Sequence, residues 1–145
     1  MPNLPKRVAN QINAAAGSVF SITKSLVSSG ITTVAADLTT VANGRLYIED
    51  IIVETDATGL AGGTNFVISS NDPVGTATPF SVATSSLGAS ATINLLTATT
   101  KQRIVLGAGY KLQFASTGSV CTGPGVAKVT VIFRRLDDNA RILPA

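Results

Sequence analysis

A strict alternation of apolar and polar side chains in residues 126–135 constrains the fold more than any other feature of the sequence. Ala127, Val129, Val131 and Phe133 occupy every second position, and mostly polar or charged side chains lie between them. Successive side chains of a β-strand point to opposite faces of a sheet. The pattern therefore predicts a strand whose four apolar side chains point into a core.

Shorter segments of the same kind recur between turn signals along the chain. They predict further strands in residues 18–27, 31–41, 46–53, 65–70, 80–83, 90–96, 102–106 and 109–115. Asn43-Gly44 tolerates positive φ and predicts a tight turn, and residues 107–109 are expected to close a hairpin between the last two of these strands.

No segment has the length and period of a substantial helix, so the chain lacks the crossover helices that parallel strands need. We therefore predict an all-β fold, an antiparallel β-sandwich over residues 18–135 that forms a jelly roll of about eight strands. An immunoglobulin-like sandwich is the alternative, because about seven strands suffice for it.

The longest apolar run breaks the alternation. Leu46 and Ile48 share one face of a regular strand, whereas Ile51 and Val53 fall on the opposite face. A β-bulge at Glu49-Asp50 would bring all four apolar side chains to one face and leave both carboxylates outside. We predict such a bulge.

The two ends of the chain are expected to be extended arms. Pro2 and Pro5 punctuate a polar N-terminal segment, residues 1–17, for which a short helix over residues 6–16 and a frayed end are both compatible with the sequence. Residues 136–145 are predicted to form a second arm, a C-terminal tail.

The composition favours a subunit that packs against other proteins. Only 13% of the residues are charged, against roughly a quarter in ordinary soluble domains. The net charge of +3 is dispersed and aromatic residues make up only 5%, so neither the basic stripe nor the stacking platform of a nucleic-acid-binding protein is present. No apolar stretch is long enough to cross a membrane, which favours a protein made in the cytoplasm without a membrane partner.

The absence of histidine argues against an enzyme, because it removes the usual general base and every Ser/His or Cys/His pair. No cofactor motif is found. Glu54 and Asp56 could offer oxygen ligands to Ca²⁺, but two carboxylates without an Asp-rich spacing are a weak signal, so we predict no metal. The single cysteine, Cys121, is interpreted as a small apolar residue that is partly buried.

Two features near the C-terminus indicate a contact surface. Ile132 lies on the otherwise polar face of its predicted strand. Arg134 and Arg135 are followed closely by Asp137 and Asp138, a mixed cluster suited to charge-assisted contacts across a subunit boundary.

Taken together, these features resemble the small jelly-roll cement or decoration proteins of tailed bacteriophages. The similar elements are the proline-containing N-terminal arm, the Thr/Ala/Gly-rich strands without His or Trp, the Leu106-Gly-Ala-Gly-Tyr-Lys-Leu112 segment and the closing Val129-Thr-Val-Ile-Phe-Arg-Arg135 strand. None of them is a diagnostic motif, so no functional residue is assigned by family.

The resemblance implies a non-enzymatic virion protein on the capsid surface. It would associate with itself as a homodimer or homotrimer and would bridge subunits of the major capsid protein. Arms that become ordered on docking bury large areas, so we expect contacts from both arms. The expected contact residues are Leu4, Lys6, Arg7, Val8, Ile12, Arg141, Ile142 and Leu143.

Two other functions share this composition. A phage tail or fibre subunit would show every feature described above. A carbohydrate-binding β-sandwich would need exposed aromatic side chains, and the chain offers no Trp and only Tyr47 and Tyr110 as tyrosines.

Overall fold

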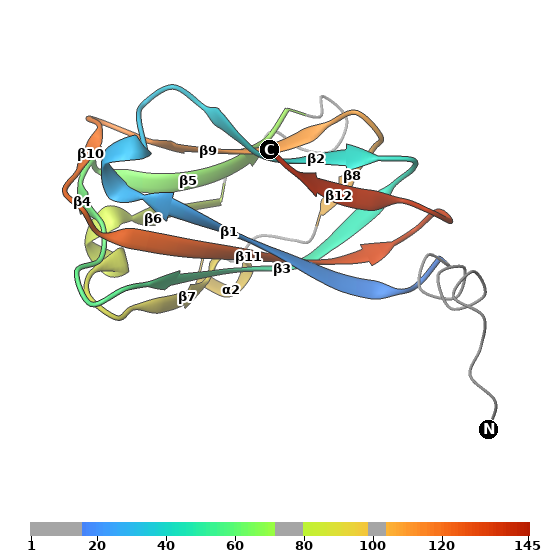
Figure 1. Cartoon of the computed structure of the whole chain (residues 1–145), viewed down its shortest axis with the longest axis horizontal. Helices are drawn as coiled ribbons and strands as arrows, with labels where there is room; N and C mark the ends of the chain where they lie inside the picture. The colour runs from blue at the N-terminus through green and yellow to red at the C-terminus, as the bar shows by residue number, and fades with distance from the viewer. Residues whose placement is uncertain (1–15, 72–79, 99–103) are drawn as a thin grey trace.

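The fold is nearly all β, as the sequence predicts, and consists of two antiparallel sheets packed face to face like a sandwich (Figure 1). The computed structural model describes residues 16–71, 80–98 and 104–145. The predicted helix over residues 6–16 therefore lies outside the described residues except for residue 16. The first two residues of the strand predicted over residues 102–106 also lie outside them.

The strands of each sheet come from distant parts of the chain, and every pair is antiparallel. The first sheet has the order β1 (Val19–Val27), β11 (Val126–Arg135), β3 (Leu46–Thr55) and β7 (Thr92–Asn94), and β8 (Ile104–Leu106) also pairs with β3. The second sheet has the order β12 (Arg141–Pro144), β2 (Ala36–Ala42), β9 (Lys111–Ser116), β5 (Asn65–Ser70) and β6 (Phe80–Ala83).

Short elements close one end of the sandwich and part of its far edge (Figure 1). They are the strand pair β4 (Ala61–Gly62) and β10 (Cys121–Thr122), the 3₁₀ turns η1 (Ser28–Gly30) and η2 (Thr84–Leu87), and the helical turn α2 (Leu95–Ala98). The β4–β10 pair lies outside the strands predicted from the sequence, which missed it.

The core lies between the sheets and is built from the inward faces of both. Ile48 and Val129 of the first sheet and Phe66 and Leu112 of the second are each at most 1% exposed. The predicted inward face of residues 126–135 is confirmed, because its four apolar side chains are all buried.

The predicted bulge in the third strand is confirmed. Ile132 of β11 is opposite Asp50, but Phe133 is opposite Ile48, so the pairing skips Glu49. The shift by one residue lets apolar side chains on both sides of it reach the core, and Ile48 and Ile51 are both fully buried.

The predicted strand over residues 90–96 is wrong at its end. Only Thr92–Asn94 is a strand, and the chain then forms α2. Leu95 and Leu96 are 0% and 8% exposed. Consecutive side chains of a strand point to opposite faces, so a helical turn is the conformation that turns both leucines toward the core.

The predicted hairpin at residues 107–109 is also wrong. The segment does connect two strands, β8 and β9, but β8 pairs with β3 in the first sheet, whereas β9 lies between β2 and β5 in the second. Residues 107–109 therefore cross from one sheet to the other.

The predicted C-terminal arm is wrong for residues 141–144, which form β12 on the edge of the second sheet. Ile142 is opposite Val41 and is only 7% exposed, and Ala140 before it is fully buried. Docking of this strand covers part of the core, which explains why the segment is not free.

Candidate interaction surfaces

The contact residues predicted for the N-terminal arm, Leu4, Lys6, Arg7, Val8 and Ile12, lie outside the described residues. The first described residues are held by the C-terminal part of the domain. The backbone N–H of Ala16 donates to Asp138 Oδ1 at 2.8 Å, and that of Gly17 donates to the Arg135 carbonyl at 2.7 Å. Residues 16 and 17 are therefore joined to the segment that follows β11.

The cluster of Arg134, Arg135, Asp137 and Asp138 makes contacts within the domain, and the predicted contacts across a subunit boundary stay a prediction. Arg134 Nε donates to Glu49 Oε1 at 2.7 Å. Arg135 donates from Nε to the carbonyl of Ala140 and lies over the Phe20 ring, with its guanidinium carbon 3.6 Å from the ring centroid. Asp138 accepts from Ala16, as described above.

Asp137 makes the most complete ion pair of this cluster, with Arg45 of the turn between β2 and β3. Arg45 donates from Nε to Oδ2 and from Nη2 to Oδ1, each at 2.9 Å, and its backbone N–H donates to Oδ2 at 2.8 Å. These hydrogen bonds from Arg45 lower the pKa of Asp137 from 3.8 to about 2. The pair fastens the turn that leads into β12.

The three contact residues predicted in the C-terminal tail differ in exposure. Ile142 packs in the core and is 7% exposed, so within the domain it offers little surface to a partner. Leu143 is 39% exposed and Arg141 is exposed, both on the outer side of β12. For these two residues, contact with a partner stays a prediction.

Ile132 lies on the outer face of the first sheet, as predicted, and is half-buried. It is opposite Ser21 of β1 and Asp50 of β3, and the next outward residue of β11, Thr130, shares a hydrogen bond with Thr23 at 2.9 Å. Uncharged side chains therefore occupy the part of this face that adjoins β1.

Ion pairs flank these uncharged side chains on both sides. Lys128 Nζ lies 2.9 Å from Glu54 Oε2 at one end of β11, and Arg134 is paired with Glu49 at the other. Each of these two positive charges is therefore matched by a carboxylate on the neighbouring strand.

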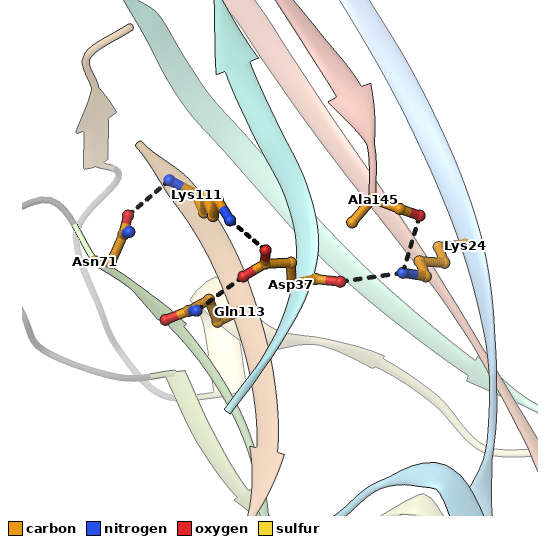
Figure 2. A network of polar contacts seen from close by, with 6 residues as sticks. All are labelled: Lys24, Asp37, Asn71, Lys111, Gln113 and Ala145. Carbon is orange, nitrogen blue, oxygen red and sulfur yellow. Dashed lines mark hydrogen bonds and ion pairs between the residues drawn. The ribbon is translucent and has the colours of Figure 1, made fainter. Parts of the chain in front are cut away.

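A polar network joins strands of the second sheet on its outer face (Figure 2). The Asp37 carboxylate pairs with the Lys111 ammonium and accepts from Gln113 Nε2 at 2.9 Å. Asn71 Oδ1 accepts from the backbone N–H of Lys111 at 2.7 Å. Hydrogen bonds from Lys111 and Gln113 lower the pKa of Asp37. These groups satisfy one another, which suits fastening of strands better than binding of a ligand.

Lys24 extends this network from the edge of the first sheet to the second (Figure 2). Its Nζ donates to the backbone carbonyls of Asp37 at 3.0 Å and Ala145 at 3.4 Å, and it lies 5.8 Å from the centroid of the Phe114 ring. Lys24 thereby connects β1 to β2 and to Ala145, the residue that follows β12, a role that sequence reasoning missed. The sequence does carry one signal for this role, because Lys24 occupies an even-numbered position of β1, on the face that points inward.

The carboxylates considered for Ca²⁺ have other roles. Glu54 pairs with Lys128, and Asp56 Oδ1 accepts from the backbone N–H groups of Gly59 at 2.8 Å and Thr58 at 3.0 Å, which lowers the pKa of Asp56. Both lie beside an open depression. Within the described residues, no group of three or more potential metal ligands is present.

Cys121 is more deeply buried than the sequence suggested, at 2% exposed. Burial raises the pKa of its thiol. A raised pKa disfavours the reactive thiolate, so the interpretation of Cys121 as an apolar packing residue is in keeping with its surroundings.

Comparison of the chain with protein-family models, curated proteins and solved structures finds no match. Among the residues that the structure describes, no helix has the length and apolar character needed to cross a membrane.

Proposed function

We propose that this chain is a non-enzymatic structural subunit of a tailed-phage virion, a decoration or cement protein that binds the outside of the capsid and bridges major capsid subunits. The observation that carries the proposal is the order in which the strands pair. The nearly neutral outer surface of the domain and the arm at its N-terminus give further support.

The strand order supports a jelly roll as the finer description of the fold. A jelly roll can be pictured as a long hairpin wrapped into two sheets, so that early strands pair with late ones. Here β1 pairs with β11, β2 with β9, β3 with β7 and β8, and β5 with β6. In this description β12 is an addition at the edge of the second sheet. Jelly rolls are common in capsid-associated proteins, so likeness of fold supports the capsid role by analogy.

The surface chemistry supports a role in protein assembly. Four cations described above are matched within the chain by the carboxylates of Asp137, Asp37, Glu54 and Glu49. A protein neighbour therefore meets few unpaired charges that would have to be desolvated. A surface of this kind also suits repeated weak contacts over a symmetric shell, where avidity multiplies modest affinities.

The sugar-binding alternative has less support. Tyr47 and Tyr110 are both half-buried, so neither presents a fully open ring as a platform for a sugar. A tail or fibre subunit remains the alternative that the experiment below must separate from a capsid protein.

The test is sedimentation of the purified chain with shells of the major capsid protein, and in parallel with isolated tails, of the virus that encodes it. We expect saturable binding to shells and none to tails. Removal of residues 2–15 should leave the β-type circular dichroism spectrum unchanged and weaken shell binding about tenfold or more. Binding to tails alone would replace the capsid role with the tail alternative.

A pair of variants separates the chemistry of the arm from its length. Replacing Leu4, Val8 and Ile12 together by serine should weaken binding as the deletion does, because apolar contacts are lost. Val34, which is 74% exposed on the domain, provides the control, and Val34→Ser should bind as the wild type does. Unchanged binding of the triple variant would remove the arm from the proposal.

A further inference from the structure

The first sheet ends in a long strand with an open side. β1 is at the end of the sheet order, and among the residues that the structure describes it pairs only with β11. It spans nine residues, contains no proline and carries a single charge, that of Lys24. Figure 1 shows β1 and β12 crossing the same side of the sandwich. An edge of this length is a template for pairing with a further strand, and proteins normally protect such edges.

The hydrogen-bonding groups on the open side belong to the odd-numbered residues of β1. The bonds from Ser28 N–H to the Gly125 carbonyl and from Arg135 N–H to the Ser18 carbonyl continue the ladder to β11 at both ends, so the even-numbered residues bond to β11. The backbone groups of the odd-numbered residues point the other way. The side chains of these same residues, Val19, Ser21, Thr23, Ser25 and Val27, are all exposed.

The sequence of β1 is nearly a palindrome about Thr23. Val19 mirrors Val27 and Ser21 mirrors Ser25 as identical residues, Phe20 mirrors Leu26 as another apolar residue, and Ile22 and Lys24 differ in character. In an antiparallel pair of identical strands, a two-fold axis through Thr23 would place each residue opposite its mirror position. Each exposed valine, 50% exposed at position 19 and 49% at position 27, would then lie opposite a valine of the other copy.

We propose that β1 pairs antiparallel with β1 of a second copy of this chain, about a two-fold axis that passes beside Thr23. The pairing would form about ten backbone hydrogen bonds from groups that the domain leaves unused. It would join the two five-stranded first sheets into one continuous sheet. This self-association does not depend on the proposed virion role, and it is tested with the purified protein alone.

Lys24 is compatible with this pairing although an inward charge usually guards an edge. In the proposed register Lys24 is opposite Ile22 of the second copy, so no like charges face each other directly. Its ammonium already has the Asp37 and Ala145 carbonyls as acceptors. An added strand therefore leaves no unpaired charge behind.

The neighbouring edge strand β12 is a weaker candidate for self-pairing. It has four residues, it includes Pro144, which lacks an N–H group, and its ends are unlike. The palindrome in β1 is what favours a second copy over an unrelated strand, since an unrelated partner does not require mirrored positions.

Sedimentation equilibrium of wild type, Thr23→Lys and Thr23→Glu tests the proposal. Wild type should be a dimer that dissociates on dilution. In each variant, residue 23 meets its own charge across the axis, so the dimer dissociation constant should rise at least ~tenfold. An equimolar mixture of the two variants should recover a heterodimer, because lysine then faces glutamate.

Ser81→Lys, on the exposed face of the distant edge strand β6, is the matched control and should dimerise as wild type does.

Hydrogen exchange is a second measurement, and it distinguishes loss of the dimer from loss of the fold. The amides of Ser21, Thr23 and Ser25 should be protected at high protein concentration and should exchange faster on dilution, while those of Ile22 and Leu26 stay protected throughout. A wild-type monomer at all concentrations overturns the proposal. So does a folded Thr23→Lys variant that dimerises normally, or a mixture that stays monomeric.

Discussion

The two sheets end side by side, in β1 and β12, and the two edges are built differently. β12 is short, begins with Arg141 and ends with Pro144, features that commonly protect an edge from adding a strand. β1 is more than twice as long and has none of them apart from Lys24, which is turned toward the second sheet. Protection of one edge beside an open one supports the pairing proposed for β1.

The comparison also distinguishes the two ends of the chain. β12 is held by the core through Ile142 and by the Arg45–Asp137 pair before it, so it belongs to the domain. β1 is held by β11 through its whole length, yet its outward side remains available. The C-terminal strand completes the domain, and the N-terminal strand can extend it to a second copy.

The largest expected effect tests whether β12 is an integral strand. Ile142→Ala should lower the free energy of unfolding by about 2–4 kcal/mol, because a buried isoleucine leaves a cavity. Leu143→Ala, its more exposed neighbour, should change it by less than about 0.5 kcal/mol. Urea denaturation measures both. If both variants had equally small effects, residues 141–144 would not be an integral strand but the free arm that the sequence predicted.

A smaller effect is expected where Lys24 bridges the two edges. Lys24→Met keeps the apolar stem but removes the hydrogen bonds to Asp37 and Ala145, and it should lower the free energy of unfolding by about 1 kcal/mol. Self-association should not weaken, because the open edge loses its only charge.

Lys128→Met is the control for this variant. It removes a cation from the outer face of the same sheet, but one that is half-exposed and paired with Glu54, so its effect should be below about 0.5 kcal/mol. The role of Lys24 as a bridge would be wrong if both variants had the same effect, measured by urea denaturation as above.

Local patterns predicted the parts of the fold that depend on period and turn chemistry. The alternation in residues 126–135 and the bulge at Glu49-Asp50 follow from the need to bury one face of a strand, which a short window of sequence reveals. The positive φ angles of Asn43 and Gly44 likewise follow from residue type.

Pairing partners were not predictable in the same way, because they depend on residues far apart in the chain. Nothing near residues 107–109 shows that the strands on either side belong to different sheets. The run Arg141-Ile142-Leu143-Pro144 is too short to show a clear period, so burial of Ile142 could be recognised only with β2 beside it. Of the interaction surfaces, the palindrome of β1 is visible in the sequence, but its position at an edge is not.

The smallest expected effect concerns the turn that leads into β12 and depends on pH. The pKa of Asp137 is lowered from 3.8 to about 2 in the folded chain by its hydrogen bonds from Arg45, so the folded state favours the carboxylate. A group of this kind stabilises the fold above its unfolded pKa, and the stabilisation is lost as pH falls through the folded value.

Between about pH 4 and pH 2, the melting temperature of wild type should therefore approach that of Asp137→Asn, which lacks the charge at every pH. Arg45→Gln should show the same convergence, because it removes the other half of the pair. Thermal melts at half-unit pH steps measure it, and a difference that stays constant down to pH 2 would mean that shape at this turn, and not charge, holds β12 in place.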